Sequence, residues 1–266
     1  MEKTFNKVIL YVLLFSTIVL LFLINDSAFI EKNPTCNNFV INVYLYLALS
    51  ISLIGVFSYL INYLLYGNTT KYFKALDMLE IFKSIGVYYI VSIILVFVFI
   101  ILIAISKDYD TKNTLYNHSI WAIFLFLISV TIFPKFKDIA SYEYIDDALL
   151  ITTIIFLVMT GVYYTFSDFF MEKYNQIGLG LFVALISIII IEIIHILFYN
   201  NNSFGVFKLT SYFVIVLFSL YVSYDTATII KKEDLCVDYP NYPKFSIDFF
   251  LDILNLFSRI LFLKRK

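Results

Sequence analysis

The sequence predicts an all-α polytopic membrane protein. Of its 266 residues, 61% are hydrophobic and only 15% are charged, and the mean hydropathy is +0.89. Ordinary soluble domains are about half apolar and about a quarter charged. The chain also contains repeated apolar runs of about 20 residues, the length that an α-helix needs to cross a bilayer. We therefore expect the lipid bilayer to be its main partner.

Eight apolar segments are long enough to be membrane helices. They are residues 8–25, 39–66, 84–106, 115–134, 148–167, 176–199, 208–230 and 246–263. No small-x-small cleavage pattern follows the first segment, so we expect it to remain as a helix and not to be removed as a signal peptide. The connections are short and polar, which predicts one helical bundle without a separate soluble domain.

Charge and cysteine content restrict the partners. The formal net charge is -1 and no basic domain is present, which argues against nucleic-acid binding. The two cysteines, Cys36 and Cys236, fall on the same side of an eight-span topology, and the distribution of Lys and Arg favours the non-cytoplasmic side. They could form a disulfide there or remain two unrelated thiols. No Cys/His cluster indicates a zinc site.

Asp225 and Asp252 are the most informative residues because both lie in apolar sequence. A carboxylate in the middle of a membrane helix costs about 2.5 to 3.5 kcal/mol on insertion scales. Such a group needs a partner, a water-filled cavity or a proton, and it usually marks function. Two carboxylates at matching depth predict a shared site.

The last apolar segment carries a narrow polar stripe. Its members, at spacings i, i+4, i+7 and i+11, are Asp248, Asp252, Asn255 and Arg259. At 100° per residue this spacing places them on one face, while the rest of the helix is apolar. We interpret the segment as a helix at the centre of a bundle with its stripe toward a pore or buried site. The alternative is a helix lying in the membrane interface, which usually has a wider, Lys-rich face.

The preceding segment has a matching stripe with the same spacing. Its members are Tyr221, Asp225, Thr228 and Lys232. If the two stripes face each other, Asp225 and Asp252 approach in a medium of low dielectric, where both cannot ionise cheaply and one proton is shared. Deprotonated, they would offer the hard oxygen ligands that Ca²⁺ prefers and could bind it transiently. The alternative is a structural role in which each aspartate pairs separately with a basic residue such as Lys232 or Arg259.

Glu192 and His195 form a second polar pair, three residues apart near the end of an apolar run. They could line a proton or cation path. Equally, they could lie at a water-facing helix end and only satisfy one another. We regard Glu192, His195, Tyr221, Thr228, Asp248, Asn255 and Arg259 as candidate pore-lining residues.

The C-terminal part of the chain resembles the signature of the Bax-inhibitor family, also called lifeguard or transmembrane Bax inhibitor motif proteins. The resemblance rests on residues 218–230 (FSLYVSYDTATII), 238–240 (DYP) and 246–261 (SIDFFLDILNLFSRIL). Upstream, residues 167–169 (SDF) and 42–49 (NVYLYLAL) are similar to further family positions. Aligned in this way, residues 39–266 form the family's seven-helix domain, and residues 1–38 are an additional N-terminal membrane helix with its loop.

The resemblance implies a seven-helix bundle around a central C-terminal helix. It also implies a pH-regulated Ca²⁺ leak across an intracellular membrane, suppression of cell death and contact with apoptosis-regulating membrane proteins. The family's di-aspartyl pH sensor corresponds to Asp225 and Asp252. Some members hold the pair closed with an early arginine; here Lys107 is the nearest candidate, a partner that cannot bind in a bidentate way.

The compartment is predicted only by this analogy, as endoplasmic reticulum or Golgi. Heavy use of Ile, Asn, Lys, Tyr and Phe suggests AT-rich coding, which leaves a viral membrane as an alternative.

Two further classes of function compete with a channel. A membrane scaffold or anti-apoptotic interaction protein would conduct nothing, and its aspartates would be structural. An intramembrane aspartyl protease would need a Gly-x-Gly-Asp motif at its second aspartate, whereas Asp252 follows Phe-Phe-Leu. We therefore expect no enzymatic activity and no cofactor other than Ca²⁺ as a permeant ion.

Overall fold

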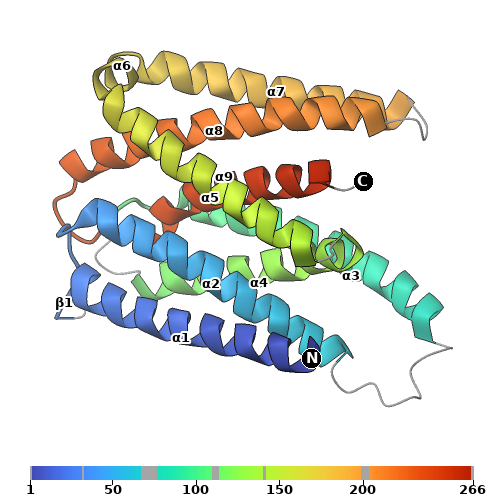
Figure 1. Cartoon of the computed structure of the whole chain (residues 1–266). Helices are drawn as coiled ribbons and strands as arrows, with labels where there is room; N and C mark the ends of the chain where they lie inside the picture. Colours follow the sequence, from blue (N-terminus) through green and yellow to red (C-terminus); the bar gives the residue numbers. More distant parts are fainter. Residues whose placement is uncertain are drawn as a thin grey trace. The chain divides into compact units, whose positions relative to one another are not determined.

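The computed structural model describes residues 2–31, 33–66, 77–109, 114–139, 142–198 and 204–264. Within these ranges the chain is almost entirely α-helical (Figure 1). The helices are α1 (Glu2–Ala28), α2 (Phe39–Tyr66), α3 (Asp77–Ile105), α4 (Thr114–Ile139), α5 (Tyr142–Thr165), α6 (Ser167–Glu172), α7 (Tyr174–Phe198), α8 (Phe204–Asp234) and α9 (Tyr242–Lys264). A small antiparallel hairpin pairs β1 (Phe29–Ile30) with β2 (Asn33–Pro34).

The prediction of an all-α polytopic membrane protein is confirmed. By length and composition, six of the described helices can cross a membrane, namely α1, α2, α4, α5, α7 and α8. In α3 the apolar stretch Val91–Ile105 is shorter. The helix α9 is not among the six, and it carries Asp248, Asp252 and Arg259 within its apolar part. Helix α6 was not predicted, because its residues fall almost entirely in the connection expected between the apolar runs 148–167 and 176–199.

Two compact units divide the chain. Unit 1 consists of Met1–Asp138 and Cys236–Ile247, and unit 2 of Ile139–Leu235 and Asp248–Lys266. Helix α9 therefore begins in unit 1 and continues in unit 2. The additional helix α1 belongs to unit 1 together with α2, and the proposed division at residue 38 stays a prediction.

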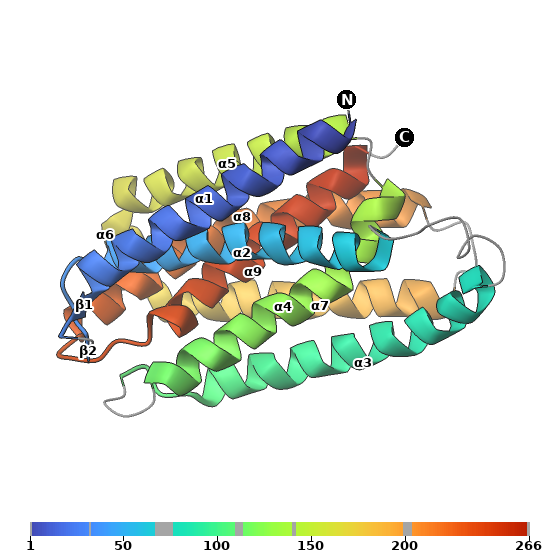
Figure 2. The same ribbon diagram turned by 90° about the horizontal axis from the view of Figure 1, so that it is seen from below.

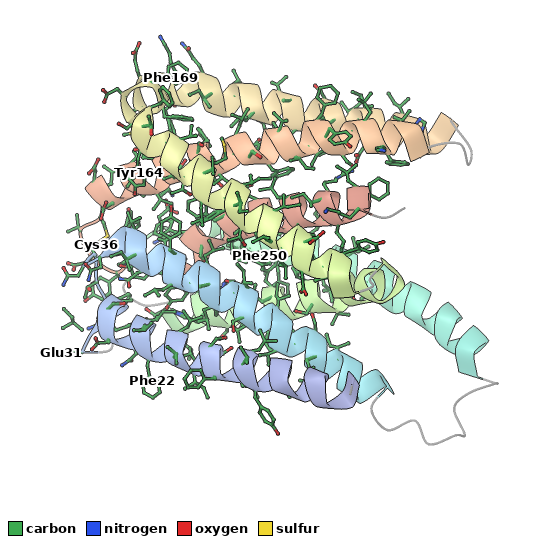
Figure 3. All side chains as sticks on the ribbon, viewed as in Figure 1. Phe22, Glu31, Cys36, Tyr164, Phe169 and Phe250 are labelled. Atoms are coloured by element: carbon green, nitrogen blue, oxygen red, sulfur yellow. A yellow bond between two sulfur atoms is a disulfide. The ribbon has the colours of Figure 1, made fainter. Side chains whose placement is uncertain are left out.

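In unit 1, α1 packs against α2 through a cluster of hydroxyl groups. The Ser52 hydroxyl lies 2.8 Å from both the Ser16 and the Thr17 hydroxyls. Leu13 contacts Gly55 so closely that an added Cβ would lie 3.0 Å from it. Small residues allow this approach, and shared hydroxyls satisfy each other where lipid offers no partner. The opposite side of α1 is apolar and exposed, as Figure 3 shows for Phe22.

We expect Ser52→Ala to weaken the α1–α2 contact by about 0.5 to 1 kcal/mol. The effect is small because the Ser16 and Thr17 hydroxyls keep bonds to the Leu13 carbonyl oxygen. The thermal unfolding midpoint in detergent micelles measures it. Ser119→Ala is the control, since that exposed hydroxyl bonds only within its own helix among the described residues; an equal loss there would contradict a specific contact.

The described connections next to α1, α2 and α9 in unit 1 have defined backbone conformations. The hairpin turn has Glu31 at φ 49°, and α2 follows Asn38 at φ 52°, both in the left-handed region. Figure 2 shows the hairpin at the end of α1. Helix α9 starts with Asn241 as its N-cap, whose Oδ1 accepts a bond from the Lys244 backbone N–H at 3.3 Å. Pro243 in the first turn suits a helix start, since its missing N–H has no helical partner there.

Unit 2 is built around α8, which packs against α5 and α7. Helices α7 and α8 run side by side (Figure 1). A buried apolar cluster joins α8 to α9. It consists of Val214, Phe218, Val222 and Leu256. The Ser223 hydroxyl donates to the Met159 carbonyl oxygen at 2.7 Å, which ties α8 to α5. This packing fixes which face of α8 turns toward α9.

Candidate functional site

The structure brings Asp225 of α8 and Asp252 of α9 together within unit 2. Their carboxyl groups lie close enough for the charge of one to act on the other. Asp252 is only 4% exposed and Asp225 is half-buried. The second oxygen of Asp252, Oδ2, is buried and has no hydrogen-bond partner among the described residues. Two carboxylates can only accept hydrogen bonds, so a direct bond between two such groups needs a shared proton.

Asp248 adds a third carboxylate one turn earlier on α9. It is exposed, and it lies close enough for its charge to act on both Asp225 and Asp252. Tyr221 also faces the pair, since its hydroxyl lies within the field of both carboxyls. The two polar stripes of the sequence therefore do meet, at Tyr221, Asp225, Asp248 and Asp252.

The other members of the stripes lie in other contacts. Thr228 bonds to the Tyr174 hydroxyl at 2.9 Å and so belongs to the contact between α7 and α8. Asn255 donates to the Leu251 carbonyl oxygen of its own helix at 2.8 Å. These positions show no direct bond to the aspartate pair among the described contacts.

Arg259 pairs with Glu192 in a bidentate ion pair. Its Nη1 lies 2.7 Å from Glu192 Oε1, and its Nη2 donates to Oε2 at 2.9 Å. The alternative that Arg259 neutralises Asp252 is thus not what the structure shows. Sequence spacing suggested His195 as a neighbour of Glu192; His195 is 8% exposed and packs edge-on against Phe207. The ion pair joins α7 to α9, so its role in the structure is to hold two helices.

A tyrosine contact that the sequence did not indicate lies next to Asp225. Tyr224 stacks on Tyr174 with ring centroids 4.8 Å apart and an interplanar angle of 19°. Gly178 of α7 makes room for it, since an added Cβ would lie 2.4 Å from the Tyr224 hydroxyl oxygen. An isolated glycine within an apolar helix was the only signal for this close approach.

Lys107 and the two cysteines belong to unit 1. The Lys107 side chain is exposed, and its carbonyl oxygen accepts a bond from Asn241 at 3.1 Å. Its role as a partner of the aspartate pair stays a prediction. Cys36 and Cys236 are joined by a disulfide with a Cα–Cα distance of 5.9 Å. The interpretation of the two cysteines as a disulfide is confirmed, and the alternative of two unrelated thiols is wrong.

A family comparison identifies the chain. Residues 36–264 match the family described as "Inhibitor of apoptosis-promoting Bax1". The chain belongs to the Bax inhibitor-1 family. Among curated proteins, no relative matches the chain. The suspected resemblance is thereby confirmed over most of the sequence.

For this Bax inhibitor family protein, the match includes both aspartates and the bridge. It begins at Cys36, so α1 and the hairpin lie outside the matched region. The protein is therefore a multi-pass membrane protein of this family with an additional N-terminal helix packed on α2.

Proposed function

We propose that this protein is a pH-sensitive Ca²⁺ leak channel of an intracellular membrane, gated by Asp225 and Asp252. The observation that carries the proposal is the close approach of the two carboxyl groups, with Oδ2 of Asp252 buried and without a partner among the described residues. While one proton is shared, the contact is attractive. When it is lost, two like charges face each other in a medium of low dielectric and repel. Loss of the shared proton would therefore weaken the contact between α8 and α9 at Asp225 and Asp252.

Carboxylate chemistry supports Ca²⁺ as the permeant ion. Deprotonated Asp225 and Asp252, with Asp248 beside them, would present oxygen ligands of the kind that Ca²⁺ prefers. Oδ2 of Asp252 is buried without a partner among the described residues, so it could take part without breaking a bond. No group of three or more acidic, His or Cys side chains in the described ranges is arranged to hold a metal.

The proposal assigns no enzymatic role and no cofactor. The endoplasmic reticulum or Golgi is the proposed compartment, with a viral membrane as the alternative, and apoptosis-regulating membrane proteins are the proposed partners. These assignments rest on analogy within the family.

Reconstitution into liposomes tests the channel. We expect wild-type protein to conduct Ca²⁺ at a rate that changes with pH, and Asp225→Asn with Asp252→Asn to give a pH-independent rate. An amide keeps the size of the side chain but removes the titration, so loss of the pH response reports on the proton itself. Flux of an entrapped Ca²⁺ indicator between pH 5 and 8 is the measurement.

Asp147→Asn is the matched control, because Asp147 is an exposed aspartate of unit 2 that pairs with Lys264. It should leave the pH profile as in the wild type. If the double variant keeps both the flux and its pH profile, the aspartate pair is not the gate.

A second candidate function is a non-conducting, death-suppressing interaction protein. The observation that favours it is the family description itself, which names inhibition of an apoptosis-promoting protein. Cell survival after an apoptotic stimulus separates the two. Full protection by the Asp225→Asn, Asp252→Asn variant, together with no flux from wild-type liposomes, would support the interaction protein.

A further inference from the structure

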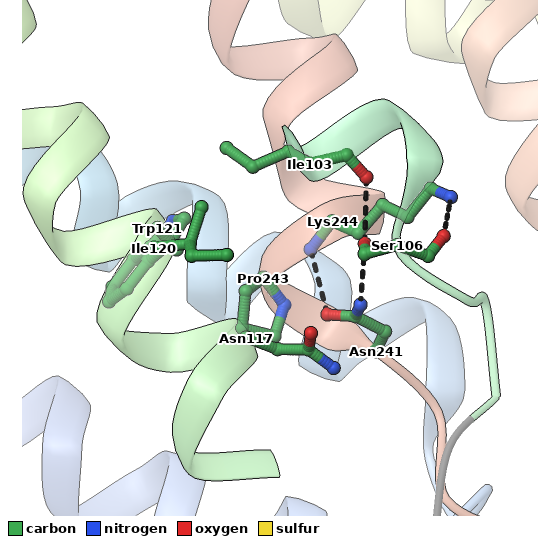
Figure 4. Close-up of a pocket in the computed structure, with 8 residues that line it drawn as sticks. All are labelled: Ile103, Ser106, Asn117, Ile120, Trp121, Asn241, Pro243 and Lys244. Carbon is green, nitrogen blue, oxygen red and sulfur yellow. Dashed lines mark hydrogen bonds between the residues drawn. The ribbon is translucent and has the colours of Figure 1, made fainter. Parts of the chain in front are cut away.

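The connection between α8 and α9, residues 235–241, is fastened at several points within unit 1. Asn241 donates from its backbone N–H to the Asp108 carbonyl oxygen at 2.9 Å and from Nδ2 to the Ser106 hydroxyl at 3.2 Å. Pro240 pairs with Tyr109 in an isolated antiparallel bridge. Figure 4 shows Asn241 and Ser106 beside Lys244. The end of α3 is therefore bound to the start of α9.

Lys244 strengthens this contact. Its Nζ lies 2.9 Å from Asp108 Oδ1 and donates to the Ala104 carbonyl oxygen at 3.0 Å and to the Ser106 carbonyl oxygen. A cation at the carboxyl end of a helix is favourable, because the last carbonyl groups have no helical partner. A small cavity beside it is lined by residues including Asn117 and Trp121.

The disulfide is the covalent part of this anchorage. Cys236 lies in the connection, and its partner Cys36 lies between the hairpin and α2. The bridge joins residues 200 positions apart. Because hydrogen bonds also hold the connection, breaking the bridge would loosen it without removing every contact.

The bridge is within reach of a reductant. Both cysteines are half-buried, and the neighbours of Cys236 are exposed, Leu235 at 64% and Val237 at 83%. Neither cysteine lies within a candidate membrane span. Thiol–disulfide exchange requires such access for the attacking thiolate.

The connection also links the two helices that carry the aspartate pair. Asp225 lies on α8 before it and Asp252 on α9 after it. Helix α9 is one helix from Tyr242 to Lys264, so its anchored first turn and Asp252 belong to the same element. The bridged connection therefore lies, along the chain, between the two helices that carry the pair.

We propose that the Cys36–Cys236 disulfide is a reducible lock on the Ca²⁺ leak. This inference rests on the function proposed above. A dithiol reductant attacks one sulfur, forms a mixed disulfide and releases the other cysteine as a thiolate. Its second thiol then displaces the remaining cysteine. In total two electrons and two protons pass to Cys36 and Cys236, and the reductant becomes a disulfide. The freed connection lets α8 and α9 separate more readily, and the leak increases.

The test uses the full chain in liposomes with and without dithiothreitol. The sequence contains only these two cysteines, so a maleimide–polyethylene glycol mass tag counts reduced thiols without ambiguity. We expect no tag before reduction and two tags after it. The Ca²⁺ flux should rise at least about fivefold on reduction, the lower end of common coupling between distant sites. Cys36→Ser with Cys236→Ser should show the high flux without reductant and no response to it.

Each outcome decides a separate point. Complete tagging with unchanged wild-type flux would overturn the lock and leave the leak channel standing. No flux in either redox state would overturn the channel and the lock together. Tagging of two thiols before reduction, in protein purified under oxidising conditions, would also overturn the lock, because no bridge would then exist. Since the decisive comparison uses wild-type protein, it does not depend on the folding of the double variant.

Discussion

Glu192→Ala should destabilise the protein by about 3 kcal/mol, because it leaves the guanidinium of Arg259 without its partner. The two side chains are 18% and 26% exposed, and two short contacts of 2.7 and 2.9 Å join them. Removing one partner of such a pair leaves a charge uncompensated in an apolar surrounding, which costs more than the pair itself contributes. The midpoint of thermal unfolding in detergent micelles measures the loss.

Two further variants make this prediction specific. Asp147→Ala removes a partner of the exposed pair with Lys264, whose side chains are 51% and 38% exposed, and should cost less than about 1 kcal/mol. Glu192→Ala combined with Arg259→Met should recover much of the loss, since an apolar side chain of similar length replaces the unpaired charge. Equal losses for Glu192→Ala and Asp147→Ala would contradict a protected ion pair.

Asn42→Ala should have a comparable effect, about 2 to 4 kcal/mol, because several buried polar groups would lose their partner. Asn42 is fully buried. Its Oδ1 accepts a bond from the Ser27 hydroxyl at 2.6 Å, and its Nδ2 donates to the Asn37 carbonyl oxygen at 2.8 Å. The same Nδ2 donates to the Tyr242 hydroxyl at 3.3 Å. One side chain thus joins α1, the start of α2 and the start of α9 within unit 1.

Ser27→Ala is the control for Asn42. It removes one hydroxyl, which bonds to Asn42 and to the Leu23 carbonyl oxygen of its own helix, and should cost about 1 kcal/mol. Resistance of the hairpin region to limited proteolysis gives a second measurement, since loss of Asn42 should expose it and loss of Ser27 should not. A smaller loss for Asn42→Ala than for Ser27→Ala would show that the network is not centred on Asn42.

Both aspartates of the candidate site could be predicted because helical spacing is local information. Asp252 with Asp248, and Asp225 with Tyr221, lie one turn apart in the sequence, so each stripe follows from 3.6 residues per turn. Because a carboxylate in lipid is unfavourable in free energy, a site shared by Asp225 and Asp252 was the simplest prediction. The structure places these four residues together, while the gating role remains our proposal.

The partner of Arg259 could not be predicted in this way. Arg259 and Glu192 are 67 positions apart, and neither spacing nor composition relates them. The local alternatives, Asp252 for Arg259 and His195 for Glu192, were reasonable because neighbours on one helix or one stripe are the only partners that sequence can indicate. Long-range pairing depends on how α7 and α9 pack.

Helix α6 is a second feature that the sequence did not predict. Residues 148–167 read as one apolar run, but the chain leaves the helix at Phe166, with φ -120°, and restarts at Ser167. The Ser-Asp pair at 167–168 was a usable signal, since both residue types are common where helices begin. A helix of six residues is too short to cross a membrane, so the search for apolar spans left residues 168–175 as a connection.

By itself, the sequence determined the class of the protein, the approximate position of nearly every helix and the faces on which the polar residues lie. Apolar length and 3.6-residue periodicity are properties of contiguous segments, and lipid leaves few alternatives to a helix. Only the tertiary structure decided that Asp225 lies beside Asp252, that Arg259 binds Glu192, and that Cys36 is bridged to Cys236. These pairings join residues 27, 67 and 200 positions apart, and packing of whole helices and loops determines them.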